Sequence, residues 1–330
     1  MSTMSNTVAA NTGQPNLGHV DTTGPNLLAH LRQLAQEKHL SIKDFALPRE
    51  HRIDAGRLHL HCLEWGDPLA TPVVFAHAGR LNAHSWDLVC LALKANYRCI
   101  AFDLPGHGDS DRAPGMDYHL ASCSEDLRGL ADSLQLGKFF LVGASQGGLQ
   151  SLAYALHHPD TLRGLVLSDS GPYLQTAGVA RQSGEMAVYQ PFERFEDIVQ
   201  MSQQDGRGRN TDRLRFTLSQ NTRQLPDGRW TWKFDTEYRT TKAAFTLATE
   251  LQGMMVRAAS LTCPVLVLHG EHSDILLADG AKHTASCFPD GRWATVPATR
   301  HLLHHDNPNA FIDILQRFFA SVPAPNHTDK

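Results

Sequence analysis

Residues 139–148 read FFLVGASQGG, and this stretch decides the fold. An apolar run leads into a Gly-x-Ser-x-Gly pattern centred on Ser145, and helical periodicity follows in residues 149–157. This order predicts a strand, a tight turn and a helix, with the serine hydroxyl projecting from the turn at the helix N-terminus. Glycine is needed at Gly143 and Gly147 because side chains there would collide with neighbouring backbone. The setting indicates a serine that can act as a nucleophile.

Strands and helices alternate on both sides of this stretch. Short apolar runs bounded by turn residues occur at Pro72–His77, Arg98–Asp103, Lys138–Gly143, Arg163–Asp169, Pro264–His269 and Arg292–Pro297. Helical periodicity occupies the intervals Ser85–Ala95, Ser122–Leu136, Leu149–His157 and Asn309–Ala320. Continuous apolar runs of this length suit strands that are buried on both faces. The sequence therefore predicts an α/β fold, with a mostly parallel sheet and helices on both faces.

The interval between Pro172 and Leu261 breaks the alternation. It is polar and rich in arginine, it contains no clear buried strand, and it is too long for an ordinary loop. We expect a mainly helical cap at residues 172–260, inserted after the sixth strand, between core segments 49–171 and 261–320. At the ends of the chain, we expect a disordered tail at 1–24, a helical extension at 25–48 and a flexible tail at 321–330.

Composition favours a cytoplasmic globular protein. The 330 residues are 42% hydrophobic, and 30 Lys and Arg against 34 Asp and Glu give a net charge of −4, with no basic excess to attract nucleic acid. No apolar run approaches the ~18 residues that span a bilayer, and the first residues lack the pattern of a secretory signal. The six scattered cysteines form no CxxC motif and are expected to be reduced core residues.

A serine nucleophile needs a general base, and the base needs an orienting acid. In this topology the chain order is serine, acid and then histidine. His301 follows the last predicted strand, at the edge where open α/β sheets place their sites. It is preferred over His304 and His305 because it comes first after that strand.

Two aspartates compete for the role of the acid. Asp274 follows the seventh predicted strand in a Gly-x-x-x-Asp turn that starts at Gly270, and it is the preferred candidate. Asp169, at the end of the sixth predicted strand, is the alternative.

Three further segments complete a resemblance to the α/β-hydrolase superfamily over about residues 50–320. HAGRLNAHSW at 77–86 is similar to the family's HG segment, YRCIAFDLPGHGDSD at 97–111 resembles its D-x-x-G-x-G-x-S stretch, and HLLHHDNP at 301–308 resembles the segment of its catalytic histidine. The resemblance implies that Ser145 is the nucleophile, His301 the base and Asp274 the orienting acid. It also implies an oxyanion hole formed by the backbone N–H groups of Gly79 and Gln146, without a cofactor or metal.

Two positions depart from the family pattern. Ala78 stands where the family usually has the glycine of HG, and Arg300 stands where a glycine usually precedes the histidine. Arg80 follows the expected oxyanion donor directly. Arg80 and Arg300 are therefore possible substrate contacts at the mouth of the site, where they would favour a carboxylate-bearing substrate such as a half-ester. The alternative is that both side chains turn outward.

The preferred function is hydrolysis of a small-molecule carboxylic ester through an acyl-enzyme. Lactone, amide or carbon–carbon bond hydrolysis on the same triad stays open, as does a non-catalytic protein that binds a small ligand or a cofactor-free oxygen enzyme. A metal site at His269, Glu271 and His272 is disfavoured because these residues lie at a strand end and not on a helix face. No nucleic-acid or membrane partner is expected, and the oligomeric state is not predicted.

Overall fold

An eight-stranded sheet forms the centre of the molecule. The computed structural model describes residues 18–179, 190–204, 211–237 and 243–323. The strands of the sheet are β1 (Arg49–Asp54), β2 (His59–Trp65), β3 (Thr71–Ala76), β4 (Tyr97–Phe102), β5 (Phe139–Ala144), β6 (Leu162–Ser168), β9 (Val265–Gly270) and β10 (Gly291–Val296). Their order is β1-β2-β4-β3-β5-β6-β9-β10. β2 is antiparallel to β1 and β4, and the remaining neighbours are parallel.

The six strands predicted from apolar runs are all present, each displaced by one residue. All six side chains of β5 are buried, as expected for a strand covered on both faces. β1 and β2 lacked this signal. β1 reads REHRID and has no fully buried residue, because it is an edge strand that pairs with β2 alone.

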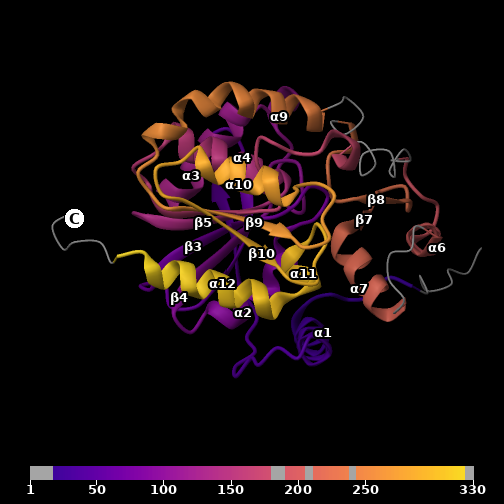
Figure 1. The fold of residues 1–330 in the computed structure, drawn as a ribbon. Helices are drawn as coiled ribbons and strands as arrows, with labels where there is room; N and C mark the ends of the chain where they lie inside the picture. Colours follow the sequence, from indigo (N-terminus) through magenta and orange to yellow (C-terminus); the bar gives the residue numbers. More distant parts are fainter. Residues whose placement is uncertain (1–17, 180–189, 205–210, 238–242, 324–330) are drawn as a thin grey trace, which may run out of the picture.

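Helices cover both faces of the sheet, as predicted (Figure 1). One layer contains α3 (Leu120–Ser133), α4 (Gln146–His157), α9 (Ala243–Met254) and α10 (Ala278–Ser286). The opposite layer contains α1 (Gly24–Glu37), α2 (Asp87–Leu93) and α12 (Pro308–Ser321). Each layer encloses its own apolar core against the sheet. Short helical turns complete the chain at η1 (Ala83–Trp86), η2 (Pro114–Met116), η3 (Met255–Ser260) and α11 (Leu303–Asp306).

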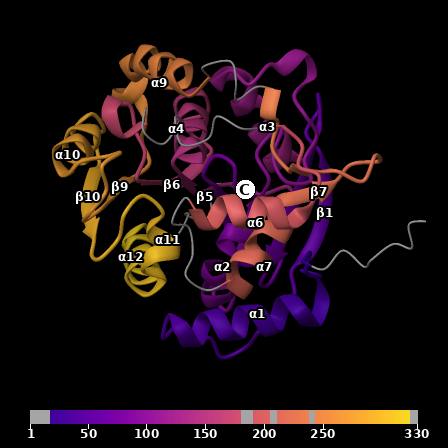
Figure 2. The same cartoon turned by 90° about the vertical axis from the view of Figure 1, so that its right-hand side faces the viewer.

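The chain between β6 and β9 builds a cap beside the carboxyl ends of the parallel strands (Figures 1 and 2). We use the word cap for α6 (Phe195–Gln204), α7 (Thr211–Asn221) and the hairpin of β7 (Thr222–Gln224) and β8 (Trp230–Trp232). The cap has a small apolar core of its own, formed by Phe195, Ile198, Val199, Leu214, Leu218 and Trp230. The sequence assigned α9 to the same insertion, but its Leu247 and Leu251 belong to the main core beside α4.

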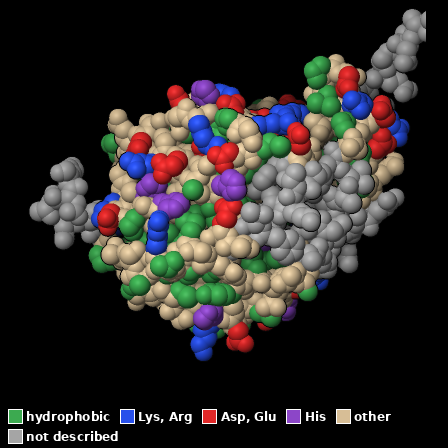
Figure 3. Space-filling view, turned by 90° about the horizontal axis from the view of Figure 1, so that it is seen from above, with side chains coloured by type: hydrophobic (Ala, Val, Ile, Leu, Met, Phe, Trp, Pro, Cys, Tyr) green, Lys and Arg blue, Asp and Glu red, His purple; other side chains and the backbone are tan. Residues whose placement is uncertain are grey.

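Acidic and basic side chains are interspersed on the face that Figure 3 shows, in keeping with the small net charge. Within the described residues, no helix combines the length and apolar character needed to cross a membrane. All six cysteines are free thiols, and five of them are buried. Burial raises the pKa of Cys62 and Cys90 well above the ordinary value, so these thiols stay protonated and unreactive.

Candidate active site

Ser145 stands at the junction between β5 and α4. Its backbone has φ 50° and ψ −117°, in a range of φ that non-glycine residues rarely adopt. The Ser145 N–H donates to the Ser168 carbonyl at 3.0 Å, and the Ser170 hydroxyl donates to the Ser145 carbonyl at 2.7 Å. The end of the neighbouring strand β6 therefore holds the strained turn in place.

His301 reaches the serine hydroxyl from the loop after β10. Its Nε2 lies 2.9 Å from Ser145 Oγ, and its Nδ1 lies 2.7 Å from Asp169 Oδ2. An ionised carboxylate only accepts hydrogen bonds, so Nδ1 carries the proton and donates it to Asp169. The lone pair of Nε2 then faces the serine hydroxyl. In this arrangement an imidazole can take the proton of the serine.

Asp169 is the first residue after β6, and its side chain is completely buried. Its Oδ2 also accepts a hydrogen bond from the Ser273 hydroxyl at 2.6 Å, and its Oδ1 accepts one from the Gly270 N–H at 3.2 Å. Three donors thus surround one buried carboxylate. They offset the cost of burying its charge and fix its orientation toward the imidazole.

The structure places the alternative candidate Asp169, and not the preferred Asp274, against His301. Asp274 is exposed, and both ring nitrogens of His301 already contact Ser145 and Asp169. The cause is the path of the chain after β9, which turns Ser273 inward and Asp274 outward. β6 is the direct neighbour of β5, so its end brings Asp169 beside the serine turn. The sequence feature that made Asp169 a candidate for the acid is its position immediately after a buried strand.

The loop after β3 carries the expected oxyanion donor Gly79. Leu104 N–H donates to His77 Nε2 at 3.0 Å, so His77 Nδ1 holds the ring proton and donates it to the Ala78 carbonyl at 2.8 Å. In a trans peptide the N–H points opposite to the C=O. Holding the Ala78 carbonyl against His77 therefore turns the Gly79 N–H away from that ring.

The second expected donor, Gln146, is the first residue of α4. The next residue, Gly147, brings this helix against the end of β3, because a Cβ there would lie 2.5 Å from the carbonyl oxygens of Ala76 and His77. The same close approach places the loop that carries Gly79 beside the helix N-terminus, where a developing negative charge is stabilised.

Asp103 anchors the turn that follows β4. Its carboxylate accepts hydrogen bonds from His61 Nδ1 at 2.8 Å, the Ala83 N–H at 2.6 Å and the Asp109 N–H at 2.8 Å. These bonds hold the pKa of Asp103 at about 2 in spite of its burial. His61, Asp103 and Asp109 offer ligand atoms within 4.8 Å of one another. Because Asp103 is already engaged and Asp109 binds Lys233, we interpret the group as a structural anchor.

A family model of the alpha/beta hydrolase fold matches residues 71–308. This chain belongs to the α/β-hydrolase fold family. An esterase of Mycobacterium tuberculosis is 29% identical over 277 residues, which cover 82% of this chain and 89% of the esterase. A 2-(acetamidomethylene)succinate hydrolase of Mesorhizobium japonicum is 28% identical over 275 residues, which cover 81% of this chain and 94% of that protein.

Solved structures agree with the family assignment. The crystal structure of an esterase from Mycobacterium tuberculosis has a TM-score of 0.72 and 26% identity, covering 91% of this chain and 99% of the esterase chain. The crystal structure of an E-2-(acetamidomethylene)succinate hydrolase has a TM-score of 0.72 and 25% identity, covering 83% of this chain and all of that chain. Hydrolases of this fold are thus similar to the protein over most of its length.

In this α/β-hydrolase, Arg80 and Arg300 flank the residues predicted for the oxyanion hole and the base. Arg80 is partly exposed and has a φ of 70°. The Arg300 N–H donates to Asp306 at 2.8 Å, which fixes its backbone, while the residue is exposed. Their contact with a substrate stays a prediction.

His304 and His305 lie away from the serine. The His304 ring stacks on Trp86 with centroids 3.9 Å apart, and burial lowers its pKa well below the ordinary value. His305 Nε2 donates to the Ser85 carbonyl at 3.2 Å, and burial lowers its pKa to about 4. Both rings are therefore neutral at neutral pH and help to hold the loop that carries His301.

A cavity of about 670 Å³ opens beside this loop. Leu81 and Leu302, which are close in sequence to Gly79 and His301, form part of its wall. α1 and the cap helix α7 supply the opposite side, through residues such as Leu31 and Leu214. Its volume falls in the range of small-molecule pockets.

Proposed function

We propose that this α/β-hydrolase cleaves a small-molecule carboxylic ester through an acyl-enzyme. Ser145 is the nucleophile, His301 the general base and Asp169 the orienting acid. The observation that carries the proposal is the hydrogen-bonded chain Ser145 Oγ–His301 Nε2 at 2.9 Å and His301 Nδ1–Asp169 Oδ2 at 2.7 Å. The esterase relative at 29% identity supports the ester as the substrate class.

The first half-reaction forms the acyl-enzyme. Ser145 Oγ attacks the ester carbonyl while His301 Nε2 takes its proton, and Asp169 stabilises the imidazolium that results. The N–H groups of Gly79 and Gln146 hold the negative charge of the tetrahedral intermediate. Each such donor contributes on the order of 3 kcal/mol to stabilisation of the transition state. His301 then protonates the departing alcohol.

The second half-reaction releases the acid. Water enters after the alcohol leaves, His301 removes its proton, and the resulting hydroxide attacks the acyl carbonyl. The same two N–H groups hold the second oxyanion, and the proton on His301 returns to Ser145 as the acid departs.

A fluorophosphonate probe tests the nucleophile. Wild-type protein should be labelled on the peptide that contains Ser145, and it should hydrolyse an activated ester. Ser145→Ala should fold normally, because only one oxygen is lost, and it should lose both labelling and hydrolysis. Labelling elsewhere, or a folded Ser145→Ala protein that keeps a tenth of the wild-type kcat, would refute the assignment.

Amide hydrolysis on the same triad is the second candidate. It is favoured by the relative named 2-(acetamidomethylene)succinate hydrolase, at 28% identity over 81% of the chain. A matched panel of ester, thioester, lactone and amide substrates separates the candidates by kcat/KM. A kcat/KM that is highest for the amide would replace the ester proposal while leaving the triad unchanged.

We also propose that Arg80 and Arg300 favour substrates with a carboxylate group. A guanidinium binds a carboxylate through two parallel charge-assisted hydrogen bonds. Arg80→Ala should lower kcat/KM for an anionic half-ester at least tenfold, about 1.4 kcal/mol, and should leave the neutral diester little changed. Equal losses on both substrates would show that Arg80 only supports the loop.

A further inference from the structure

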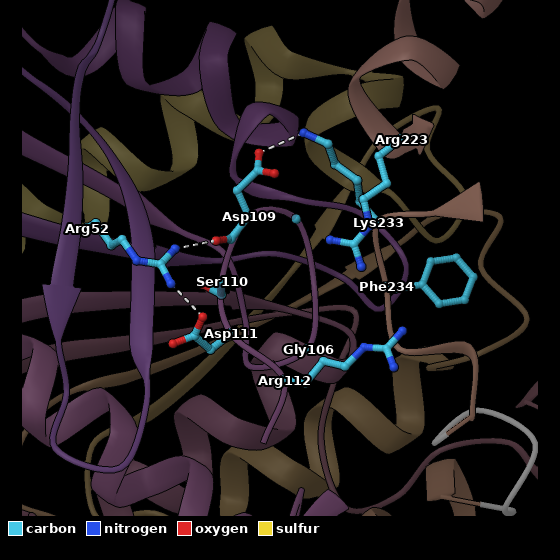
Figure 4. Close-up of a pocket in the computed structure, with 10 residues that line it drawn as sticks. Arg52, Gly106, Asp109, Ser110, Asp111, Arg112, Arg223, Lys233 and Phe234 are labelled. Atoms are coloured by element: carbon cyan, nitrogen blue, oxygen red, sulfur yellow. Dashed lines mark hydrogen bonds and ion pairs between the residues drawn. The ribbon is translucent and has the colours of Figure 1, made fainter. Parts of the chain in front are cut away.

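A second pocket lies at the seam between the core and the cap, apart from the triad. It is a cavity of about 280 Å³. One wall is the loop that follows β4, from Gly106 to Arg112, together with Arg52 of β1. The other wall comes from the cap side, through Arg223 of β7 and through Lys233 and Phe234, which directly follow β8. Figure 4 shows these side chains around the space that they enclose.

The lining is positively charged. It contains four cations, Arg52, Arg112, Arg223 and Lys233, and only two carboxylates, Asp109 and Asp111. Each carboxylate already has a partner, because Lys233 Nζ lies 2.7 Å from Asp109 Oδ2 and Arg52 Nη2 lies 2.5 Å from Asp111 Oδ1. The other two cations, Arg112 and Arg223, do not pair with either of these carboxylates.

These two guanidinium groups come from opposite walls. Arg112 belongs to the core loop, and its side chain is about half exposed. It forms a long ion pair with the buried Asp235, at 4.0 Å. Arg223 is exposed, and its guanidinium forms no hydrogen bond or ion pair with the residues that the structure describes, although its backbone pairs with Thr231 in the hairpin. In Figure 4, no dashed line joins either guanidinium to another lining residue.

Asp235 offsets only part of this charge. Its Oδ2 accepts a hydrogen bond from the Tyr118 hydroxyl at 2.7 Å, and its Oδ1 accepts one from the Glu237 N–H at 3.1 Å. Even with Asp235 included, the four cations exceed the three carboxylates.

We infer that this pocket binds a phosphate group. A phosphate dianion offers several acceptor oxygens, which Arg112 can approach from the core and Arg223 from the cap at the same time. Its negative charge complements the positive charge that remains after Asp109, Asp111 and Asp235 are counted. The cavity volume suffices for a phosphate and a small attached group, and the half-exposed arginines leave the entrance open to solvent.

A phosphate bound here would tie the cap to the loop beneath it. The seam is already a point of contact, since the Asp235 N–H donates to the Gly106 carbonyl at 2.7 Å and His107 forms a β-bridge with Phe234. On its inner side, His107 lies against His77 of the loop that carries Gly79, with ring centroids 5.3 Å apart. Bound phosphate therefore adds a link between the cap and the core at a place connected to the active site.

Calorimetric titration with inorganic phosphate tests the inference. At constant ionic strength and about pH 8, where the dianion dominates, wild-type protein should bind one phosphate per chain saturably. Arg223→Ala and Arg112→Ala should each weaken binding at least tenfold. Arg128→Ala is the matched control and should bind like wild type, because Arg128 is an exposed arginine of α3, outside the pocket, that pairs with Asp132 at 3.5 Å.

Two further titrations test where the phosphate binds and whether it is bound as a free ion or as part of a larger molecule. Ser145→Ala should bind phosphate as wild type does, because the pocket is separate from the triad; loss of binding in this variant would place the phosphate in the active site and overturn the inference. Phenyl phosphate should bind at least as tightly as inorganic phosphate, and tighter binding would identify a phosphorylated small molecule as the occupant. Absence of saturable binding, or equal binding by Arg223→Ala and wild type, would also overturn it.

Discussion

At the scale of single residues, Asp169 combines a buried charge with a fixed orientation. Its carboxylate accepts hydrogen bonds from His301, from the Ser273 hydroxyl and from the Gly270 N–H. An unpaired carboxylate in this position would be strongly disfavoured, so the three donors determine both its charge and the direction of its oxygens. The imidazole of His301 is consequently held in the tautomer that leaves Nε2 free to accept the serine proton.

Asp169→Asn should therefore lower kcat by about 10⁴-fold. The amide can present its NH₂ group to His301, which favours the tautomer with Nδ1 as the acceptor and leaves Nε2 protonated. Steady-state hydrolysis of an activated ester measures the effect. Asp274→Asn is the control, and it should leave kcat close to wild type because Asp274 is exposed and His301 binds Asp169. A larger loss in Asp274→Asn would return the acid to the position preferred from sequence.

The sequence narrows the candidates for the acid to two residues, and it prefers Asp274, whereas the structure places Asp169 against His301. Asp169 and Asp274 both follow predicted strands, and both precede His301 in the chain. The choice depends on whether Ser273 or its neighbour faces inward after β9. A difference of one residue in an irregular turn leaves no periodic pattern, so only the folded chain reveals it.

His304 provides a prediction about pH and stability. Its side chain is buried, and neither ring nitrogen has a hydrogen-bond partner among the described residues. Burial lowers the pKa of His304 well below 6.5 in the folded protein. As the pH falls below about 6.5, His304 is therefore protonated in the unfolded chain while it stays neutral in the folded chain. The stability linked to His304 is fully present above about pH 6.5 and is lost as the pH falls below it.

His304→Phe should reduce this loss. Phenylalanine keeps the stacking on Trp86 and removes two unpaired polar atoms, so the free energy of unfolding at about pH 7.5 should rise by roughly 1 kcal/mol. Urea unfolding at about pH 7.5 and pH 5.5 gives the comparison. The decrease in unfolding free energy between the two pH values should be smaller in His304→Phe than in wild type. An equal decrease would show that His304 does not dominate the pH dependence.

At the scale of secondary-structure elements, the close approach of α4 to β3 depends on Gly147. Gly147→Ala would place a methyl carbon 2.5 Å from the carbonyl oxygens of Ala76 and His77. The variant should lose about 1–3 kcal/mol of stability. Its kcat should also fall, because the backbone that must move leads directly to Gly79. Thermal unfolding and ester hydrolysis measure the two effects.

Gly253→Ala is the matched control, since it is also a helical glycine but has no atom within 4 Å of the added carbon. It should gain roughly 0.5–1 kcal/mol from helix propensity alone, with unchanged kcat. If both variants behave alike, the close contact of α4 with β3 does not limit stability.

How much of each element the sequence predicts depends on its burial. The six strands with continuous apolar runs were placed to within one residue because burial on both faces leaves a simple signal. β1 was missed because it lies at the edge of the sheet, where its charged side chains remain exposed to solvent and no apolar run marks the strand. The hairpin of β7 and β8 was also missed, because two three-residue strands are shorter than any pattern that periodicity detects.

At the scale of the whole molecule, the N-terminal segment joins the cap to the core. Leu27, Leu31 and Ala35 of α1 are buried in the core beneath the sheet. The same segment reaches the cap, where the His30 ring stacks on Phe216 with centroids 3.7 Å apart and the His19 ring stacks on Trp230 at 4.8 Å. These contacts link segments about 190 residues apart or more, so local sequence patterns do not reveal them.

We expect these two ring contacts to hold the cap in position over the site. The double variant His19→Ala, His30→Ala removes them and leaves the buried leucines of α1 in place. Amide hydrogen exchange should become at least tenfold faster in α7 and stay unchanged in α4 and α12, and KM should rise more than kcat falls.

Gln33→Ala, on the exposed side of α1, is the control and should leave exchange in α7 unaffected. Faster exchange throughout the core would mean that the rings stabilise the whole fold, whereas unchanged exchange in α7 would show that the cap is held by its other contacts. Burial and the nearby Arg213 lower the pKa of His30 to about 4, so its neutral ring persists at neutral pH and protonation should weaken the stacking only as the pH falls toward 4.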